Sequence, residues 1–143
     1  MPSATTSDYL YNKQMAFLLH GTDWTQLANI YVGLLKVAPA LDGTGGTEVS
    51  NSGTAYARVA IAQGGWTGPS GANLEYTNSS DIQFATPTAN WDTINAAGLY
   101  DSEIGGTNNL LFIAYLTTPK VVNNGDGAPK ILAGQLRITR ATC

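Results

Sequence analysis

Few residues of this sequence could do chemistry, and they lie far apart. His20 is the only histidine, and Cys143 is both the only cysteine and the last residue. A nucleophilic site would need His20 within hydrogen-bond distance of a nucleophile, and nothing in the spacing indicates one. A histidine at the negative end of a helix is more often structural. Zinc would need unusual carboxylate ligands, and one cysteine cannot form an intrachain disulfide. We therefore expect no enzyme, metal or cofactor.

Asp101 and Glu103 are the best-spaced pair of carboxylates. Because they are two residues apart, they would point to one side of an extended segment. Such a pair could act in glycoside hydrolysis or contribute to a calcium site. The surrounding run 100–106 (YDSEIGG) is more typical of a hairpin turn with solvated acids. The turn is the favoured interpretation, and calcium binding and catalysis stay as alternatives.

A glycine-rich loop and three aromatic residues are further candidates. The loop 42–53 contains GTGGTE, but it lacks the Lys-Ser/Thr of a phosphate-binding loop and does not open a helix. Trp66, Trp91 and Tyr100 could stack on sugars. Polar residues surround Trp66, which favours an exposed position and a possible surface contact. Trp91 is expected in the core or as a loop anchor.

The composition is that of one β-rich domain. The chain has 143 residues, of which 43% are hydrophobic and only 12% are charged, with a net charge of −3. Its seven basic residues are scattered, whereas a nucleic-acid-binding protein usually gathers them on one face. No apolar run approaches the roughly 20 residues of a membrane span, and no secretory signal is visible. We expect neither nucleic-acid nor membrane binding.

The segment Ser7–His20 predicts a short helix. It contains no Gly or Pro, Ser7 can cap its first turn, and Gly21 can end it. Leu10, Phe17 and Leu18 recur at helical spacing. The favoured interpretation is therefore an amphipathic helix that packs on its own domain.

The alternative for this segment is an arm that becomes ordered only against a partner. Its anchors would then be Tyr9, Tyr11 and Phe17. Residues 1–6 are expected to be unstructured by themselves.

Short strands dominate the rest of the chain. Alternating or apolar runs bounded by turn residues predict seven or eight of them. They are expected at 30–37, 56–62, 74–77, 81–85, 92–100, 109–117 and 131–139, with a polar loop at 63–71. Such spacing is typical of an antiparallel β-sandwich or a jelly-roll-like domain. We expect an arm with a short helix at residues 1–26 and one β-sandwich domain at 27–143.

Several short blocks occur in an order that resembles a known family. None is specific alone, but together they cover most of the chain. They are Tyr9–Lys13, Ile30–Leu34, Ala38–Pro39, Asp42–Gly43, Gly46–Ser50, Tyr56–Ala60, Ile82–Phe84, Ala89–Trp91, Gly98–Asp101, Asn109–Phe112, Thr118–Lys120, Asn123–Asp126 and Ala133–Leu136. In these blocks the chain resembles small structural proteins of tailed phages, often labelled tail-fibre-like, and especially the capsid cement or decoration proteins of cyanobacterial siphophages.

This resemblance implies a non-enzymatic virion protein on the outer capsid surface. It implies a homotrimer that bridges neighbouring subunits of the major capsid protein and so strengthens the head. The segment 1–20 would supply the arm, and three arms would make each later contact intramolecular. The alternative is a tail-fibre or tail-tip module that binds host glycans through Trp66. The short length disfavours that alternative, because receptor fibres usually carry a long trimeric shaft.

Overall fold

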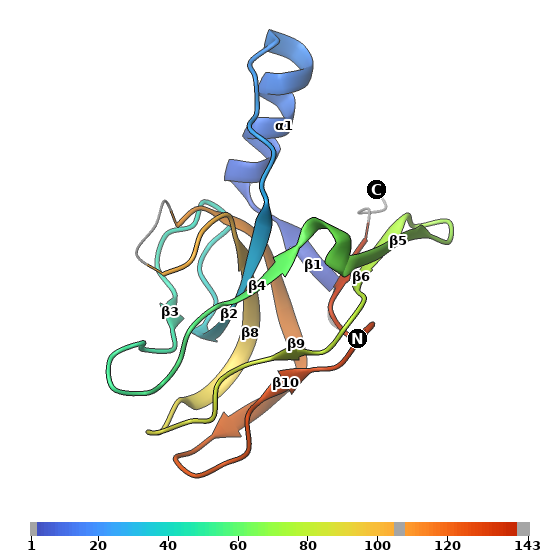
Figure 1. Cartoon of the computed structure of the whole chain (residues 1–143). Coiled ribbons are helices and arrows are strands. Elements are labelled where there is room, and N and C mark those ends of the chain that lie inside the picture. The colour runs from blue at the N-terminus through green and yellow to red at the C-terminus, as the bar shows by residue number, and fades with distance from the viewer. Residues whose placement is uncertain (1–2, 105–107, 140–143) are drawn as a thin grey trace.

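The computed structural model describes residues 3–104 and 108–139 and shows a β body from which one helical segment projects (Figure 1). The helix is α1 (Asp8–His20), and a 3-10 turn, η1, covers Gln63–Gly65. The strands are β1 (Ser3–Thr6), β2 (Asn29–Val37), β3 (Thr47–Glu48), β4 (Val59–Ala62), β5 (Trp66–Ser70), β6 (Glu75–Asn78), β7 (Ile82–Gln83), β8 (Asp92–Tyr100), β9 (Leu110–Val122), β10 (Lys130–Ile131) and β11 (Arg137–Ile138). The expected mainly β fold with a short N-terminal helix is confirmed.

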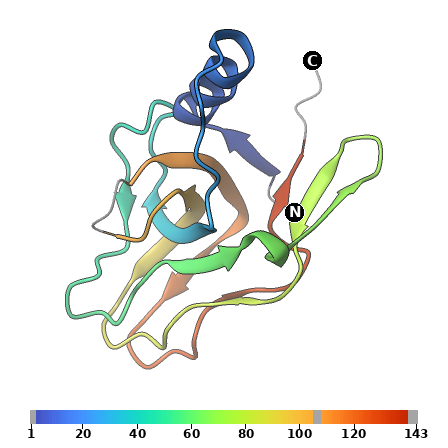
Figure 2. The same ribbon diagram turned by 45° about the horizontal axis from the view of Figure 1, so that its top comes forward.

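Two sheets build the body. The larger sheet has nine strands in the order β3-β2-β8-β9-β1-β11-β6-β5, and β4 also pairs with β2. The smaller sheet pairs β7 with β10. All pairings are antiparallel except that of β1 with β11. The larger sheet is strongly curved (Figure 2). The turn η1 joins β4, which pairs with β2 near one end of the strand order, directly to β5 at the other end.

The central strands β2, β8 and β9 carry most of the core. Long apolar runs suit strands that are covered on both faces, and Val32, Leu99 and Ala114 are fully buried. Ile82 and Phe84, in and beside β7, belong to the same hydrophobic cluster, so the small sheet closes the core. Trp91 is also buried, as expected, and its Nε1 donates to the Thr54 carbonyl at 2.9 Å.

The structure corrects the expectation for residues 1–6. Ser3–Thr6 form β1, which pairs with β9 on one side and with β11 on the other. Neighbouring strands supply the hydrogen bonds that this segment lacks alone, and Ala4 is buried beneath them. The start of the chain is therefore part of the β body.

The strands also differ from the sequence-based expectation in several places. β9 continues through Pro119 to Val122. Proline has no N–H to donate to a neighbouring strand, and the β8–β9 register shifts between Ile94 and Ala96, so the ladder is interrupted opposite this part of β9. The run 131–139 is split into β10 and β11, with Gly134 in the left-handed region at φ +76°. The polar run 63–71 includes β5, which pairs with β6.

Candidate partner-binding site

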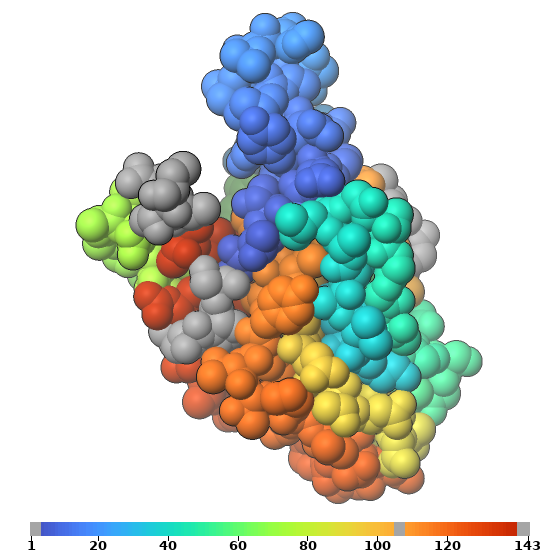
Figure 3. All heavy atoms as spheres, turned by 180° about the vertical axis from the view of Figure 1, so that it is seen from behind, coloured from blue at the N-terminus to red at the C-terminus, as the bar shows by residue number. Residues whose placement is uncertain are grey.

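The most prominent surface feature is an arm formed by α1 and the segment that returns to β2, residues 7–28. It extends away from the β body and stands clear of it when the molecule is seen from behind (Figure 3). Ser7 caps the helix, with its Oγ accepting from the Leu10 N–H at 3.2 Å. Gly21 ends it in the left-handed conformation at φ +64°. Both predicted helix boundaries are confirmed.

The base of the arm is tied to the body by several hydrogen bonds. Ser7 is buried; its N–H donates to the Leu111 carbonyl at 2.8 Å and its hydroxyl donates to the Leu110 carbonyl at 2.5 Å. The Asp8 N–H donates to the Leu41 carbonyl at 2.9 Å. These bonds join the first turn of α1 to β9 and to the loop after β2. They hold the arm in one direction relative to the body.

Apolar side chains are exposed along this arm. Leu10 is the only buried residue of α1. By contrast, Tyr11 is 57% exposed and Phe17 is 53% exposed, and Leu18 and Leu19 reach 68% and 75%. The favoured expectation, a helix whose apolar face packs on its own domain, is therefore wrong beyond the first turn. The three consecutive apolar residues 17–19 could have signalled this, because they extend over more than one helix face.

The three residues predicted as partner anchors have different environments. Tyr11 and Phe17 are exposed on the arm. Tyr9 is half-buried at the arm's base, where its hydroxyl lies 3.5 Å from the Asp101 carboxylate and Lys13 lies 5.6 Å from its ring. Burial and the negative charge of Asp101 raise the pKa of Tyr9. Tyr9 therefore helps to fix the arm, while Tyr11 and Phe17 are free for contact.

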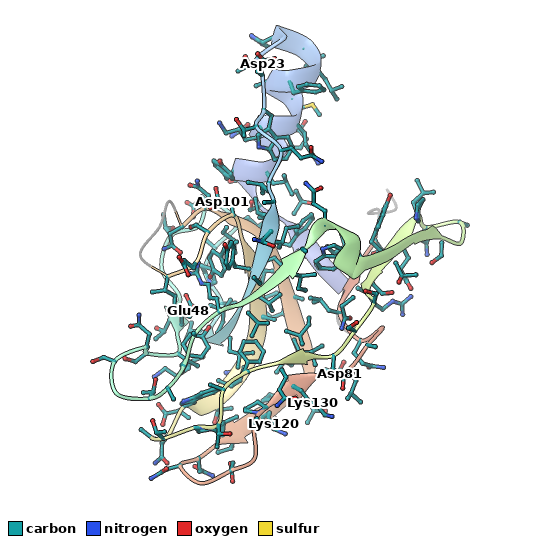
Figure 4. The ribbon with its side chains drawn as sticks, viewed as in Figure 1. Asp23, Glu48, Asp81, Asp101, Lys120 and Lys130 are labelled. Atoms are coloured by element: carbon teal, nitrogen blue, oxygen red, sulfur yellow. The ribbon has the colours of Figure 1, made fainter. Side chains whose placement is uncertain are left out.

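Asp101 and Glu103, the carboxylates considered for catalysis or calcium, both follow β8, and Asp101 lies near the base of the arm (Figure 4). Asp101 accepts from the Asn109 N–H at 2.9 Å and from its side-chain amide at 2.8 Å, so it closes the β8–β9 connection. Glu103 is exposed in that connection. Within residues 3–104 and 108–139, no three His, Cys, Asp or Glu side chains are placed to hold a metal ion. Asp101 therefore acts as a turn residue, as favoured from the sequence.

The other candidate chemical groups do not form a site either. His20 is exposed on the last turn of α1. Asp42 accepts from the N–H and hydroxyl of Thr44, which lowers the pKa of Asp42. Cys143 lies outside the described residues. No helix in the described part of the chain is long and apolar enough to cross a membrane.

A cavity of about 440 Å³ lies beside the arm's base, with Tyr9, Glu48 and Arg58 in its wall. Arg58 donates to both carboxylate oxygens of Glu48, at 2.9 and 2.6 Å, and its guanidinium lies 3.5 Å from the centre of the Tyr100 ring. The Tyr56 hydroxyl donates to Glu48 at 2.7 Å. Because these charges satisfy one another, the network serves to hold β3, the segment just before β4, and β8 together. Glu48 and Arg58 are ten residues apart, and Tyr100 is much farther along the chain, so no sequence pattern predicted this network.

A second cavity, of about 510 Å³, lies where the arm returns to β2, with Gln26, Leu27 and Asn29 in its wall. Trp66 lines it and is half-buried, whereas the sequence suggested an exposed side chain. The Trp66 indole Nε1 is buried and has no hydrogen-bond partner, unlike every other buried side-chain polar atom of the described residues. This cavity is mainly apolar, with amide side chains at its edge.

The β body carries a projecting arm with exposed apolar side chains, which is the kind of surface that marks an interaction site. In comparisons with known proteins, the profile of the family Gp80, described as "Podophage GP4 fiber I protein gp80", matches residues 5–139. The chain belongs to this family and is a phage structural protein. A search of curated proteins found no match. The narrower resemblance to cement proteins of cyanobacterial siphophages stays a prediction.

Proposed function

We propose that this protein is a fibre module of the phage virion that attaches to another virion protein through its arm. The observation that carries the proposal is the exposure of Tyr11, Phe17, Leu18 and Leu19 on an arm whose base is fixed to the body. Exposed apolar clusters of this kind mark interaction sites. Membership of a family of podophage fibre proteins supports the fibre role. The role is structural and includes no catalytic step.

The size of the arm's apolar surface favours several arms acting together. Full burial of one such side chain contributes about 1.5–3 kcal/mol, while association costs roughly 4–15 kcal/mol in lost freedom of movement. Burial of four side chains at once is of the same order as that cost, so a single arm would bind weakly. A homotrimer would present three arms, and the second and third contacts would then form intramolecularly. This argument supports the proposed trimer.

A second candidate is a capsid cement protein on the outer surface of the head, with the major capsid protein as its partner. The described residues form one small body and one arm, without a shaft, which suits a protein that bridges neighbouring capsid subunits. The two candidates share the arm and differ in the partner that it binds. They also predict different positions on the virion.

The arm can be tested with the double variant Leu18→Ser/Leu19→Ser. Both side chains are largely exposed, so the β body should fold as in the unchanged protein. We expect phage that make only this variant to yield virions without the protein, as measured by blotting of purified particles. The matched control is Leu74→Ser/Leu132→Ser, which changes two leucines that are each 50% exposed on the body. Normal incorporation of the arm variant, or equal loss with the control, would contradict attachment through the arm.

The position on the virion separates the two candidates. Gold-labelled antibody against the β body should mark the tail if the protein is a fibre module. Labelling over the whole head would instead establish the cement role and overturn the fibre proposal. The same particles, examined by electron microscopy, would show whether the protein occurs in groups of three.

A further inference from the structure

The larger of the two cavities beside the arm has the composition of a ligand site. It lies between the arm's return segment, the strands β2 and β4, and the strands β6 and β11. Its volume of about 510 Å³ is within the usual range for pockets that bind small molecules, which is roughly 300–1,000 Å³. Such pockets are mostly apolar and have a few polar groups that orient the ligand.

Three aromatic rings contribute to the wall of this cavity. Trp66 comes from β5, Tyr76 from β6 and Phe112 from β9. Trp66 and Phe112 are half-buried and Tyr76 is 41% exposed, so the rings are held by packing and still offer surface. The C–H face of a sugar ring packs well on such rings because they are apolar and have fixed orientations.

Apart from the aromatic residues, the polar side chains that line the cavity are neutral amides. Gln26, Asn29 and Gln63 line it, and no charged side chain is among its described lining residues. Gln63 is held in place because its Nε2 donates to the Leu27 carbonyl at 2.6 Å, which leaves its oxygen free to accept. No described residue forms a hydrogen bond with the side chain of Gln26 or Asn29. Amides both donate and accept, as the hydroxyl and acetamido groups of an uncharged sugar require.

The rest of the lining consists of aliphatic side chains. Leu27, Ile30, Ile61 and Ile138 supply it. A sugar with hydroxyl groups at every position would lose hydration against this surface without a compensating hydrogen bond. An acetyl methyl group would instead be buried favourably there.

Trp66 packs its ring against the cavity while its indole N–H is buried without a hydrogen-bond partner among the described residues. We propose that the cavity binds a neutral saccharide with an N-acetylhexosamine unit, whose ring packs on the aromatic side chains and whose acetamido group meets the amides. As a contact with host-surface glycans, this inference rests on the proposed fibre function.

Titration of the full chain with N-acetylglucosamine and its β-1,4-linked dimer tests the proposal. Binding is followed by the indole N–H signals in a ¹H–¹⁵N spectrum, with Trp66→Phe used to assign the Trp66 signal. We expect a saturable shift of this signal and no shift for the core residue Trp91. Glucose, which lacks the acetamido group, and N-acetylneuraminic acid, which is charged, should bind about tenfold more weakly or less. Absence of saturable binding, or equal binding of glucose, would overturn the proposal.

Two variants connect binding to the cavity. Asn29→Ala and Tyr76→Ala should each weaken binding of the dimer about tenfold, since each removes one polar or stacking contact. Tyr115→Ala is the matched control, because Tyr115 is also exposed, at 56%, but does not line the cavity. Equal weakening by the control would show that binding occurs elsewhere. A loss of self-association in Tyr76→Ala, measured by sedimentation, would show that a second copy occupies the cavity and would also overturn the proposal.

The outcome is independent of the position of the protein on the virion. Tail labelling without saccharide binding would reject the ligand site alone. Saccharide binding by a protein that labels the head would reject the fibre function and leave the ligand site intact.

Discussion

Gly33 of β2 and Gly98 of β8 face each other as direct partners in the antiparallel ladder. A Cβ atom at Gly33 would lie 2.6 Å from the Glu48 carboxylate oxygen Oε1, and one at Gly98 would lie 2.6 Å from the Tyr100 ring. The two missing side chains therefore leave the space that the ion pair of Glu48 with Arg58 and the ring beneath Arg58 occupy. The backbone of the central sheet thus determines where a buried charge network can lie.

Substitution of either glycine should destabilise the protein. Gly33→Ala and Gly98→Ala should each lower the free energy of unfolding by about 1–3 kcal/mol, as overpacking of a dense core usually does. Chemical denaturation followed by circular dichroism measures the change. Gly127→Ala is the control, because nothing lies within 4 Å of its Cβ position, and its effect should be small. If neither Gly33→Ala nor Gly98→Ala changed the free energy of unfolding, the Glu48 and Tyr100 side chains would have to move aside without destabilising the protein.

Removal of Arg58 should have a larger effect than removal of an exposed cation. The Arg58 side chain is 2% exposed and that of Glu48 is 19% exposed. Arg58→Ala would leave a mostly buried carboxylate unpaired, so we expect a loss of about 3–5 kcal/mol in the free energy of unfolding. Lys36→Ala, which breaks the exposed pair with Asp92, should cost at most about 1 kcal/mol. Similar losses in the two variants would show that the Glu48 charge is satisfied without Arg58.

The capping serine should control how firmly the arm is attached. Ser7→Ala removes the bond to the Leu110 carbonyl and the acceptor for the Leu10 N–H, with an expected loss of about 1–2 kcal/mol. Hydrogen exchange should become faster in the first turns of α1 and change less in β2 and β8. Ser79→Ala, at an exposed serine, serves as the control. Unchanged exchange in α1 would mean that the backbone bonds alone hold the arm.

Because two tyrosines are buried, we expect the free energy of unfolding to fall in alkaline solution. Burial, and then the nearby charge of Glu48, raise the pKa of Tyr56 well above its usual range and that of Tyr100 to about 12. The folded protein therefore holds these protons more tightly than the unfolded chain, whose tyrosines titrate near 10. The stability from neutral Tyr100 is complete below pH 10 and is lost as the pH rises toward about 12.

Tyr100→Phe separates this effect from general alkaline damage. The variant keeps the ring beneath Arg58 and has no phenol at position 100 to ionise. It should therefore lose less stability than the unchanged protein between pH 10 and about 12, in denaturation curves measured at several pH values. Identical pH profiles for the two proteins would contradict the role of Tyr100.

Local residue patterns determined several elements of this protein. Ser7 and Gly21 mark the ends of α1 because caps depend on only a few neighbouring residues. The alternation and apolar runs of the chain predicted β2 and β8 nearly residue for residue, because a strand shows its burial pattern in its own sequence. The same local information predicted Trp91 as a core residue or a loop anchor, and its side chain is buried.

Tertiary structure alone decided what these elements do together. Residues 3–6 become a strand only because β9 and β11 offer them hydrogen bonds from about a hundred or more residues away. The direction of α1 depends on bonds from Ser7 to the carbonyl groups of β9, so its periodicity wrongly suggested packing on the body. Likewise, the aromatic rings of the apolar cavity come from separate strands. Contacts between distant segments leave no local pattern, and for this reason the direction of the arm and the cavity beside it emerge only in the folded chain.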